Sequence, residues 1–79
     1  MKKQKLIITV ETDYSKSVVS KIKKIFWNHF DINPNVVNHS FEDALNQELC
    51  FFFVSNDETF NKLKERIKFG FGEVLESIS

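Results

Sequence analysis

The sequence is poor in the residues that build many small functional sites. Its 79 residues include one cysteine, one proline, two glycines and one arginine. The single cysteine, Cys50, excludes an intramolecular disulfide framework and predicts a reducing, cytoplasmic location. The two glycines, Gly70 and Gly72, form no phosphate-binding loop. No apolar run approaches the roughly 18 residues of a membrane span, and no cleavage site follows the short apolar run behind the N-terminal lysines. We therefore expect one domain over residues 1–79 and no membrane partner.

Catalytic and metal-binding signatures are also missing from the sequence. His29 falls near the centre of a predicted apolar helix face, which predicts a buried, hydrogen-bonded side chain, and His39 falls in a predicted strand. No cysteine–histidine pair has the spacing of a zinc site. Cys50 lies in an apolar strand without an activating base, so we interpret it as a core residue. We therefore predict a non-enzymatic protein with no cofactor and no metal site.

Charge is balanced overall, with 11 basic and 11 acidic residues, but it is unevenly placed along the chain. Residues 1–30 hold seven lysines and two acids, whereas residues 31–60 hold six acids and no base. Residues 61–79 hold four bases and three acids. This distribution predicts a basic surface on the helices and an acidic surface on the segments that connect the helices and strands. The abundance of Lys, Asn, Ile and Phe is typical of an AT-rich genome, such as that of a low-GC bacterium or a phage.

The chain begins with a predicted strand and a long helix. Residues 5–11 alternate between apolar and polar, which predicts the strand. Over residues 14–30 apolar residues recur at the helical period, with Thr12 or Asp13 as the N-cap. The helix is expected to end before Pro34, because proline disfavours helical geometry at the preceding residue. The inner face of this helix is predicted at Val18, Ile22, Ile25 and Phe26.

Two further strands and a second helix follow. Residues 35–41 predict the second strand, residues 42–48 an acidic connector, and residues 49–54 the strongest strand of the chain. Ser55, with Glu58 three residues later, has the capping-box pattern that begins a helix. The inner face of this second helix is predicted at Phe60, Leu63 and Ile67, with Gly70 as the residue after its end.

The order of these elements resembles a known fold. Residues 73–79 alternate at Val74, Glu76 and Ile78, which favours an edge strand over the helix that their composition also permits. The resulting β-α-β-β-α-β order resembles the ferredoxin-like fold, an α+β fold with two helices on one face of a four-stranded antiparallel sheet. Some ferredoxin-like nucleases place a metal-binding acid where Asp13 lies. We interpret Asp13 as a helix cap and keep a metal-dependent nuclease as a third, distant alternative.

Three consecutive phenylalanines lie in the strongest strand, Phe51, Phe52 and Phe53. Successive strand residues point to opposite faces. Either Phe51 and Phe53, or Phe52 with Cys50 and Val54, must therefore lie on the sheet face without helices. An apolar open face needs a cover, such as a second copy of the chain, another protein, a loop or stacked bases.

The same strand also resembles the RNA-recognition motif. Residues 49–56 match its third-strand pattern at Phe51, Phe53 and Val54, and lack its basic lead, its glycine and its last aromatic residue. The resemblance implies stacking of unpaired RNA bases on Phe51 and Phe53. In this alternative Lys23 and Lys24 contact phosphates. The other interpretation is that all three phenylalanines belong to the core and to a covered sheet face.

Both helices carry an aromatic residue on their outward side. At about 100° per residue, Trp27 falls opposite the apolar stripe and beside lysines, and Phe69 points away from the inner face of the second helix. An exposed tryptophan among basic residues is typical of interface hot spots. The alternative is that both aromatics fold over the helix ends and that the lysines are only solvated. The predicted partner-binding residues are Trp27, Lys16, Lys23, Lys24, Lys62, Arg66 and Phe69.

Together these patterns predict a small cytoplasmic interaction protein without enzymatic activity. It is expected to act as a regulator or inhibitor, encoded by a phage or mobile element, that docks on a partner protein or a protein–RNA complex through its lysine-rich helical face. A single-stranded RNA-binding module is the second hypothesis. A homodimer through the open sheet face is compatible with either.

Overall fold

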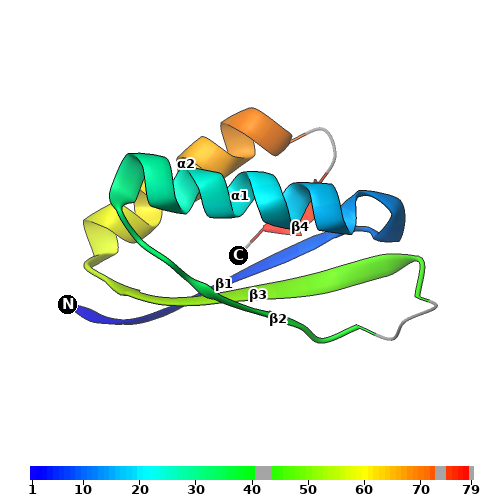
Figure 1. The fold of residues 1–79 in the computed structure, drawn as a ribbon, viewed down its shortest axis with the longest axis horizontal. Helices are drawn as coiled ribbons and strands as arrows, with labels where there is room; N and C mark the ends of the chain where they lie inside the picture. The colour runs from blue at the N-terminus through cyan, green and yellow to red at the C-terminus, as the bar shows by residue number, and fades with distance from the viewer. Residues whose placement is uncertain (41–43, 73–74, 79) are drawn as a thin grey trace.

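A computed structural model describes residues 1–40, 44–72 and 75–78. Two helices lie on one side of an antiparallel sheet (Figure 1). Strand β1, Lys2–Glu11, pairs with β3, Asn46–Ser55, over the full length of both strands. Strand β2, Asn35–Asn38, pairs with the other side of β3. The predicted α+β class, with two helices and an antiparallel sheet, is confirmed.

The C-terminal residues 75–78 are also extended. They form β4, Leu75–Ile78, which pairs antiparallel with β1 so that Ile78 lies opposite Ile8, and the sheet order is β2-β3-β1-β4. Residues 73, 74 and 79 of the predicted last strand lie outside the described residues. The same holds for residues 41–43, which belonged to the predicted second strand and connector.

Helix α1, Ser15–Phe30, ends at the predicted residue but begins one residue later than predicted. It follows a short 3-10 turn, Thr12–Tyr14, so the prediction of Thr12 or Asp13 as N-cap is wrong. The Thr12 hydroxyl instead donates to the carbonyl of Ala44, and its N–H donates to the carbonyl of Leu45 at 2.9 Å. The helix ends because Asp31 is left-handed (φ 55°, ψ 41°), a conformation that Asp tolerates better than most residues.

Helix α2, Asp57–Phe71, is capped one residue later than predicted. The Asn56 side chain accepts a hydrogen bond from the Thr59 N–H at 2.8 Å, which satisfies one of the free donors of the first turn. Ser55 is the buried last residue of β3, so the predicted capping box is wrong. Gly70 lies inside α2, and the residue after the helix is Gly72.

Strand β3 begins at Asn46, earlier than the apolar pattern indicates. Residues 46–48 were predicted as a connector because their side chains are polar. Their backbones nevertheless continue the ladder with β1, where Gln47 lies opposite Val10. Gln47 is buried, and its amide is satisfied by hydrogen bonds with the Asn38 side chain (2.6 Å) and the Thr12 hydroxyl (3.1 Å). A polar strand segment is therefore stable here.

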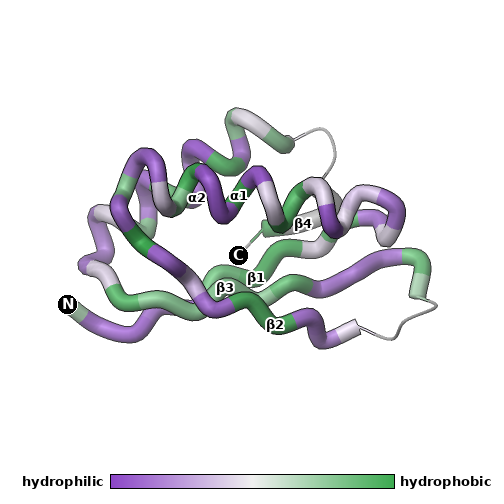
Figure 2. Tube along the Cα trace, in the orientation of Figure 1, coloured by the Kyte–Doolittle hydropathy of each residue, from purple (hydrophilic) through white to green (hydrophobic). Residues whose placement is uncertain are grey.

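The core lies between the sheet and the helices. Figure 2 shows α1 alternating between hydrophobic and hydrophilic residues, above hydrophobic stretches of β1 and β3. The Phe26 ring stacks on Phe51 at 5.7 Å between centroids and meets Phe53 edge-on at 4.9 Å. Such aromatic pairs contribute about 0.5–1.5 kcal/mol beyond the area that they bury. The buried apolar residues of the core are Leu6, Ile8, Val10, Val18, Ile22, Phe26, Leu49, Phe51, Phe53, Leu63 and Ile67.

Candidate partner-binding surface

Trp27 lies on the outer side of α1, as its helical phase predicts. Its side chain is 59% exposed, whereas the preceding residue, Phe26, is fully buried. Val18, Ile22 and Phe26 fill the side of the helix that meets the sheet. A residue one step after Phe26 is rotated by about 100° and so leaves that side. The prediction that Trp27 is exposed is confirmed.

Trp27 lines a shallow hollow together with two of the predicted lysines. Lys23 and Lys24 lie four and three residues before Trp27, one helical turn away, and Ser20 lies about one turn further back. Asn28 completes the helical wall, and Asn33 closes the hollow from the segment that leads to β2. The exposed indole of Trp27 and the ammonium groups of Lys23 and Lys24 therefore line the same hollow.

A second hollow lies between α1 and the edge strand β2. It shares Ser20 and Lys23 with the first, so the two form one track along the outer flank of α1. This second hollow has a volume of about 610 Å³, and Lys16 lies at the end that is farther from Trp27. The lining residues are Ser15, Lys16, Val19, Ser20, Lys23, Val36, Asn38 and Leu49. We call this track, from Lys16 to Trp27, the α1–β2 flank.

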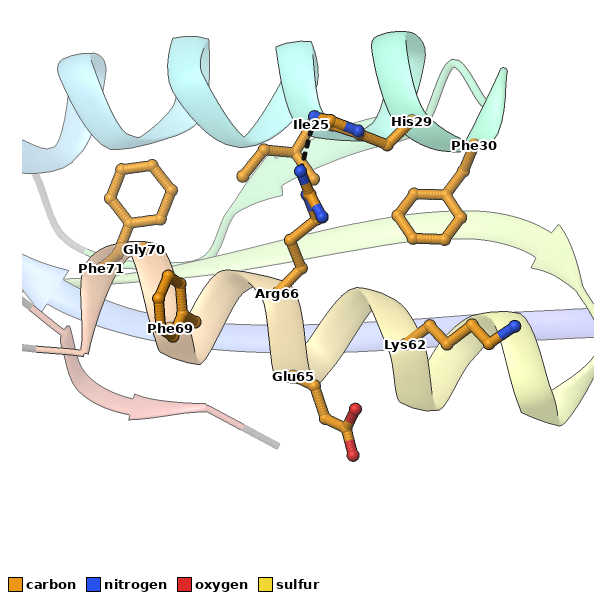
Figure 3. Close-up of a pocket in the computed structure, with 9 residues that line it drawn as sticks. All are labelled: Ile25, His29, Phe30, Lys62, Glu65, Arg66, Phe69, Gly70 and Phe71. Carbon is orange, nitrogen blue, oxygen red and sulfur yellow. Dashed lines mark hydrogen bonds between the residues drawn. The ribbon is translucent and has the colours of Figure 1, made fainter.

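The predicted residues of α2 belong to a different surface, the groove between α1 and α2. In Figure 3, Phe30 and Phe71 point into the space between the helices, and Glu65 points away from it. Lys62, Arg66 and the 95% exposed Phe69 lie along the α2 side of this groove. The predicted seven-residue site is therefore divided between two surfaces that share no lining residue.

His29 is exposed in this groove, so its predicted burial is wrong. Its Nε2 lies 3.1 Å from Nη2 of Arg66, which reaches across from α2 (Figure 3). Because a guanidinium only donates hydrogen bonds, Nε2 must accept. The helical phase of His29 is that of Ile25, one turn earlier, and both side chains line the groove between the helices.

Basic residues near α2 are largely engaged within the protein. Lys62 pairs with Glu58 at 3.1 Å, one helical turn earlier, and Lys2 pairs with Asp57 at 2.9 Å. The hydrogen bonds from Lys2 and Gln4 lower the pKa of Asp57 below its ordinary value of 3.8. Among the described residues, neither ion pair involves Lys16, Lys23 or Lys24. The three lysines of the α1–β2 flank therefore stay available to a partner.

The sheet register decides which phenylalanines face the open side. Phe51 and Phe53 face the helices and are 0% and 7% exposed, so they offer no face to an RNA base and their assignment to base stacking fails. Phe52 points to the other side, where the Lys5 ammonium lies 5.8 Å from its ring centroid. Cys50 is fully buried, as predicted for a core residue. Exposed apolar side chains on the open face are Val37 and Val54.

The described residues contain no group of three or more His, Cys, Asp or Glu side chains that could hold a metal ion. Asp13 is exposed in the 3-10 turn before α1, and His39 is exposed just after β2. Neither helix in the described part of the chain is long and apolar enough to cross a membrane.

Several residues of the α1–β2 flank were missed by the sequence analysis. Val36, Asn38 and Asn33 come from β2 and the segment before it, and only the tertiary arrangement brings them beside α1. One local signal exists in the sequence. Ser20, with lysines at positions −4, +3 and +4, predicts a notch in a basic helix surface.

Comparison of the chain with protein-family models, with curated proteins and with solved structures finds no match. Its function must therefore be inferred from its own residues and their arrangement.

Proposed function

We propose that this protein is a small non-enzymatic interaction protein, a regulator or inhibitor, that docks on a partner protein through the α1–β2 flank. The observation that carries the proposal is the 59% exposed Trp27 in one hollow with Lys23 and Lys24. Tryptophan supplies a large, rigid apolar surface and is enriched among residues that dominate binding energy. The lysines around it add charge complementarity, which mainly speeds association and selects the partner.

The proposal narrows the predicted binding face to one side of α1. Lys62 has an intramolecular ion pair and Arg66 contacts His29, so a partner would have to compete for both side chains. Lys16, Lys23 and Lys24 are exposed and take part in neither of the two ion pairs seen among the described residues. Phe69 lines the neighbouring groove and lies outside the proposed docking surface.

We also propose the finer fold, the ferredoxin-like split β-α-β arrangement with residues 75–78 as a fourth strand. The sheet order β2-β3-β1-β4 and the antiparallel pairing of β4 with β1 support it. A cytoplasmic location is part of the same proposal, since Cys50 is a free, buried thiol of the kind that a reducing compartment preserves.

Single-stranded RNA binding through the open sheet face is the second candidate. Phe52, partly exposed with Lys5 above its ring, is the observation that favours it. Its aromatic contact is thus a residue other than the Phe51 and Phe53 of the sequence hypothesis. A protein–RNA complex as partner would combine both candidates.

Affinity capture from the native host tests the main proposal. The baits are the wild-type chain, Trp27→Ala and, as a matched control, Phe69→Ala, which removes an exposed aromatic from the other surface. We expect the same partner with wild type and Phe69→Ala, and its loss with Trp27→Ala. Equal capture by Trp27→Ala would contradict the proposal. Nuclease treatment of the lysate separates the candidates, because loss of capture after digestion would indicate RNA.

A further inference from the structure

The outer edge of β2 carries unpaired backbone groups whose identity follows from one hydrogen bond. The N–H of His39 donates to the carbonyl of Glu48 at 3.0 Å, and these residues continue the β2–β3 register. In an antiparallel ladder, hydrogen-bonded pairs alternate with non-hydrogen-bonded ones. Val37 is therefore bonded to β3, whereas the N–H and C=O groups of Val36 and Asn38 point outward. No strand among the described residues covers that edge.

The side chains of the same two residues line the hollow beneath α1. Val36 and Asn38 form its β2 wall, with Val19 and Leu49 as apolar neighbours. A strand added outside β2 would hydrogen-bond to Val36 and Asn38. Directly opposed residues of antiparallel strands project their side chains to the same face. Every second side chain of the added strand would thus enter the hollow.

The charge of the hollow selects an acidic occupant. Lys16 and Lys23 lie seven residues apart on α1, about 10 Å along the helix axis. That distance corresponds to about three residues of an extended strand, at about 3.3 Å each. Among the described residues, the linings of the two joined hollows contain Lys16, Lys23 and Lys24 and no acid. Flexible lysine side chains can meet carboxylates at alternate strand positions along this length.

Resting on the proposed function, we propose that the partner contributes an extended acidic segment that adds to the outer edge of β2 as a further strand. Acidic side chains at alternate positions enter the hollow toward Lys16 and Lys23, and the end of the segment nearest Asn33 contacts Trp27. Main-chain hydrogen bonds give affinity in this mode, and alternate side chains give specificity. A protein segment fits better than a nucleic acid because the edge presents donors and acceptors in the repeat of a peptide backbone.

Selection from a library of random displayed decapeptides tests the charge pattern. With the immobilised wild-type chain, we expect enrichment of peptides with Asp or Glu at every second position. The double variant Lys16→Glu/Lys23→Glu should lose these peptides and favour Lys or Arg at the same spacing. Enriched acids at helical spacing, or a pattern unchanged in the double variant, would overturn the proposal.

Backbone pairing is tested with the most enriched peptide as the probe. On binding, NMR hydrogen exchange should slow by about tenfold or more at the Val36 and Asn38 amides and stay unchanged at Val37, which the sheet already protects. N-methylation of the peptide, one residue at a time, should weaken binding about tenfold at alternate positions and little between them. Binding without protection of Val36 and Asn38 would overturn the strand, as would an N-methylation effect without period two.

The two proposals fail differently. Partner capture that depends on Trp27, with no protection of Val36, leaves the docking function intact and removes the added strand. A peptide that protects Val36 but binds equally to Trp27→Ala keeps the strand and removes Trp27 as anchor. As the nucleic-acid arm, a ten-nucleotide oligouridine that binds in competition with the peptide, without protecting these amides, would assign the flank to RNA instead.

Discussion

The two sides of α1 carry similar residues and differ in what those residues already contact. On the α1–β2 flank, Trp27 and three lysines line connected hollows beside an open strand edge. In the α1–α2 groove, Lys62 and Arg66 are held by Glu58 and His29. The flank has three exposed cations and the groove has two, so the count of exposed cations alone distinguishes the two sides only weakly. The two sides differ in how many of these side chains remain free to contact a partner.

The largest expected effect is on the free energy of unfolding, and it compares alanine variants of two adjacent residues of α1. Phe26 is fully buried against Phe51 and Phe53, whereas Trp27 is exposed. Phe26→Ala should lower the free energy of unfolding by about 3–5 kcal/mol. Trp27→Ala should lower it by less than about 1 kcal/mol. Urea denaturation followed by circular dichroism measures both, and a Trp27 loss close to that of Phe26 would show that the indole stabilises the fold rather than a complex.

The next effect is on binding and compares the two exposed aromatics. Trp27→Ala should weaken the complex with the captured partner by about 2 kcal/mol, which is roughly 30-fold. Phe69→Ala should change affinity less than about threefold, because its groove is not the docking surface. Isothermal titration calorimetry of both variants measures this contrast. The reverse order of effects would move the site to the α1–α2 groove.

A smaller effect compares lysines of the two sides. Lys23→Ala should weaken binding by up to about fivefold, as expected for the loss of about 1 kcal/mol from an exposed charge contact, and the loss should shrink at high salt. Lys62→Ala removes an ion pair within α2. It should cost a few tenths of a kcal/mol of stability and leave affinity unchanged. Titrations at two salt concentrations measure both variants, and equal salt dependence would remove the distinction between the sides.

The smallest effect concerns the charges that hold α2 to β1. The hydrogen bonds from Lys2 and Gln4 lower the pKa of Asp57 below 3.8 in the folded protein. The stabilisation is therefore fully present above the ordinary pKa and is lost as pH falls through the lowered one. Wild type should exceed Asp57→Asn in urea midpoint at pH 7, and the difference should vanish in strong acid. A difference that grows on acidification would contradict this assignment.

Local periodicity predicted much of the fold because each buried stripe obeys one simple spacing. Val18, Ile22 and Phe26 follow the helical period, and Leu6 and Ile8 follow the strand period. The predictions failed where a neighbouring segment decides the outcome. His29 has a core phase but lies above an open groove, and residues 46–48 are polar but are held by their backbone pairing with β1.

The candidate site was predictable only in part. Helical phase alone placed Trp27 outside the core, beside Lys23 and Lys24. The alternation of β3 could not decide which phenylalanines face the helices, since both faces of the strand are apolar; the register with β1 decides it. The hollow beside β2 depends on where a distant strand lies relative to α1, which no local pattern contains.

The long ladder between β1 and β3 also constrains the order of folding. It joins Lys2 to Ser55, so the N-terminal strand gains its main partner only when more than half of the chain is available. Contacts of such large sequence separation slow folding, because loop closure precedes any gain from pairing. During synthesis, residues 2–11 must stay unpaired on this side until residues 46–55 have left the ribosome. The four lysine and glutamine residues at the start of β1, Lys2, Lys3, Gln4 and Lys5, keep the waiting strand hydrophilic at one end and so oppose premature edge-to-edge association.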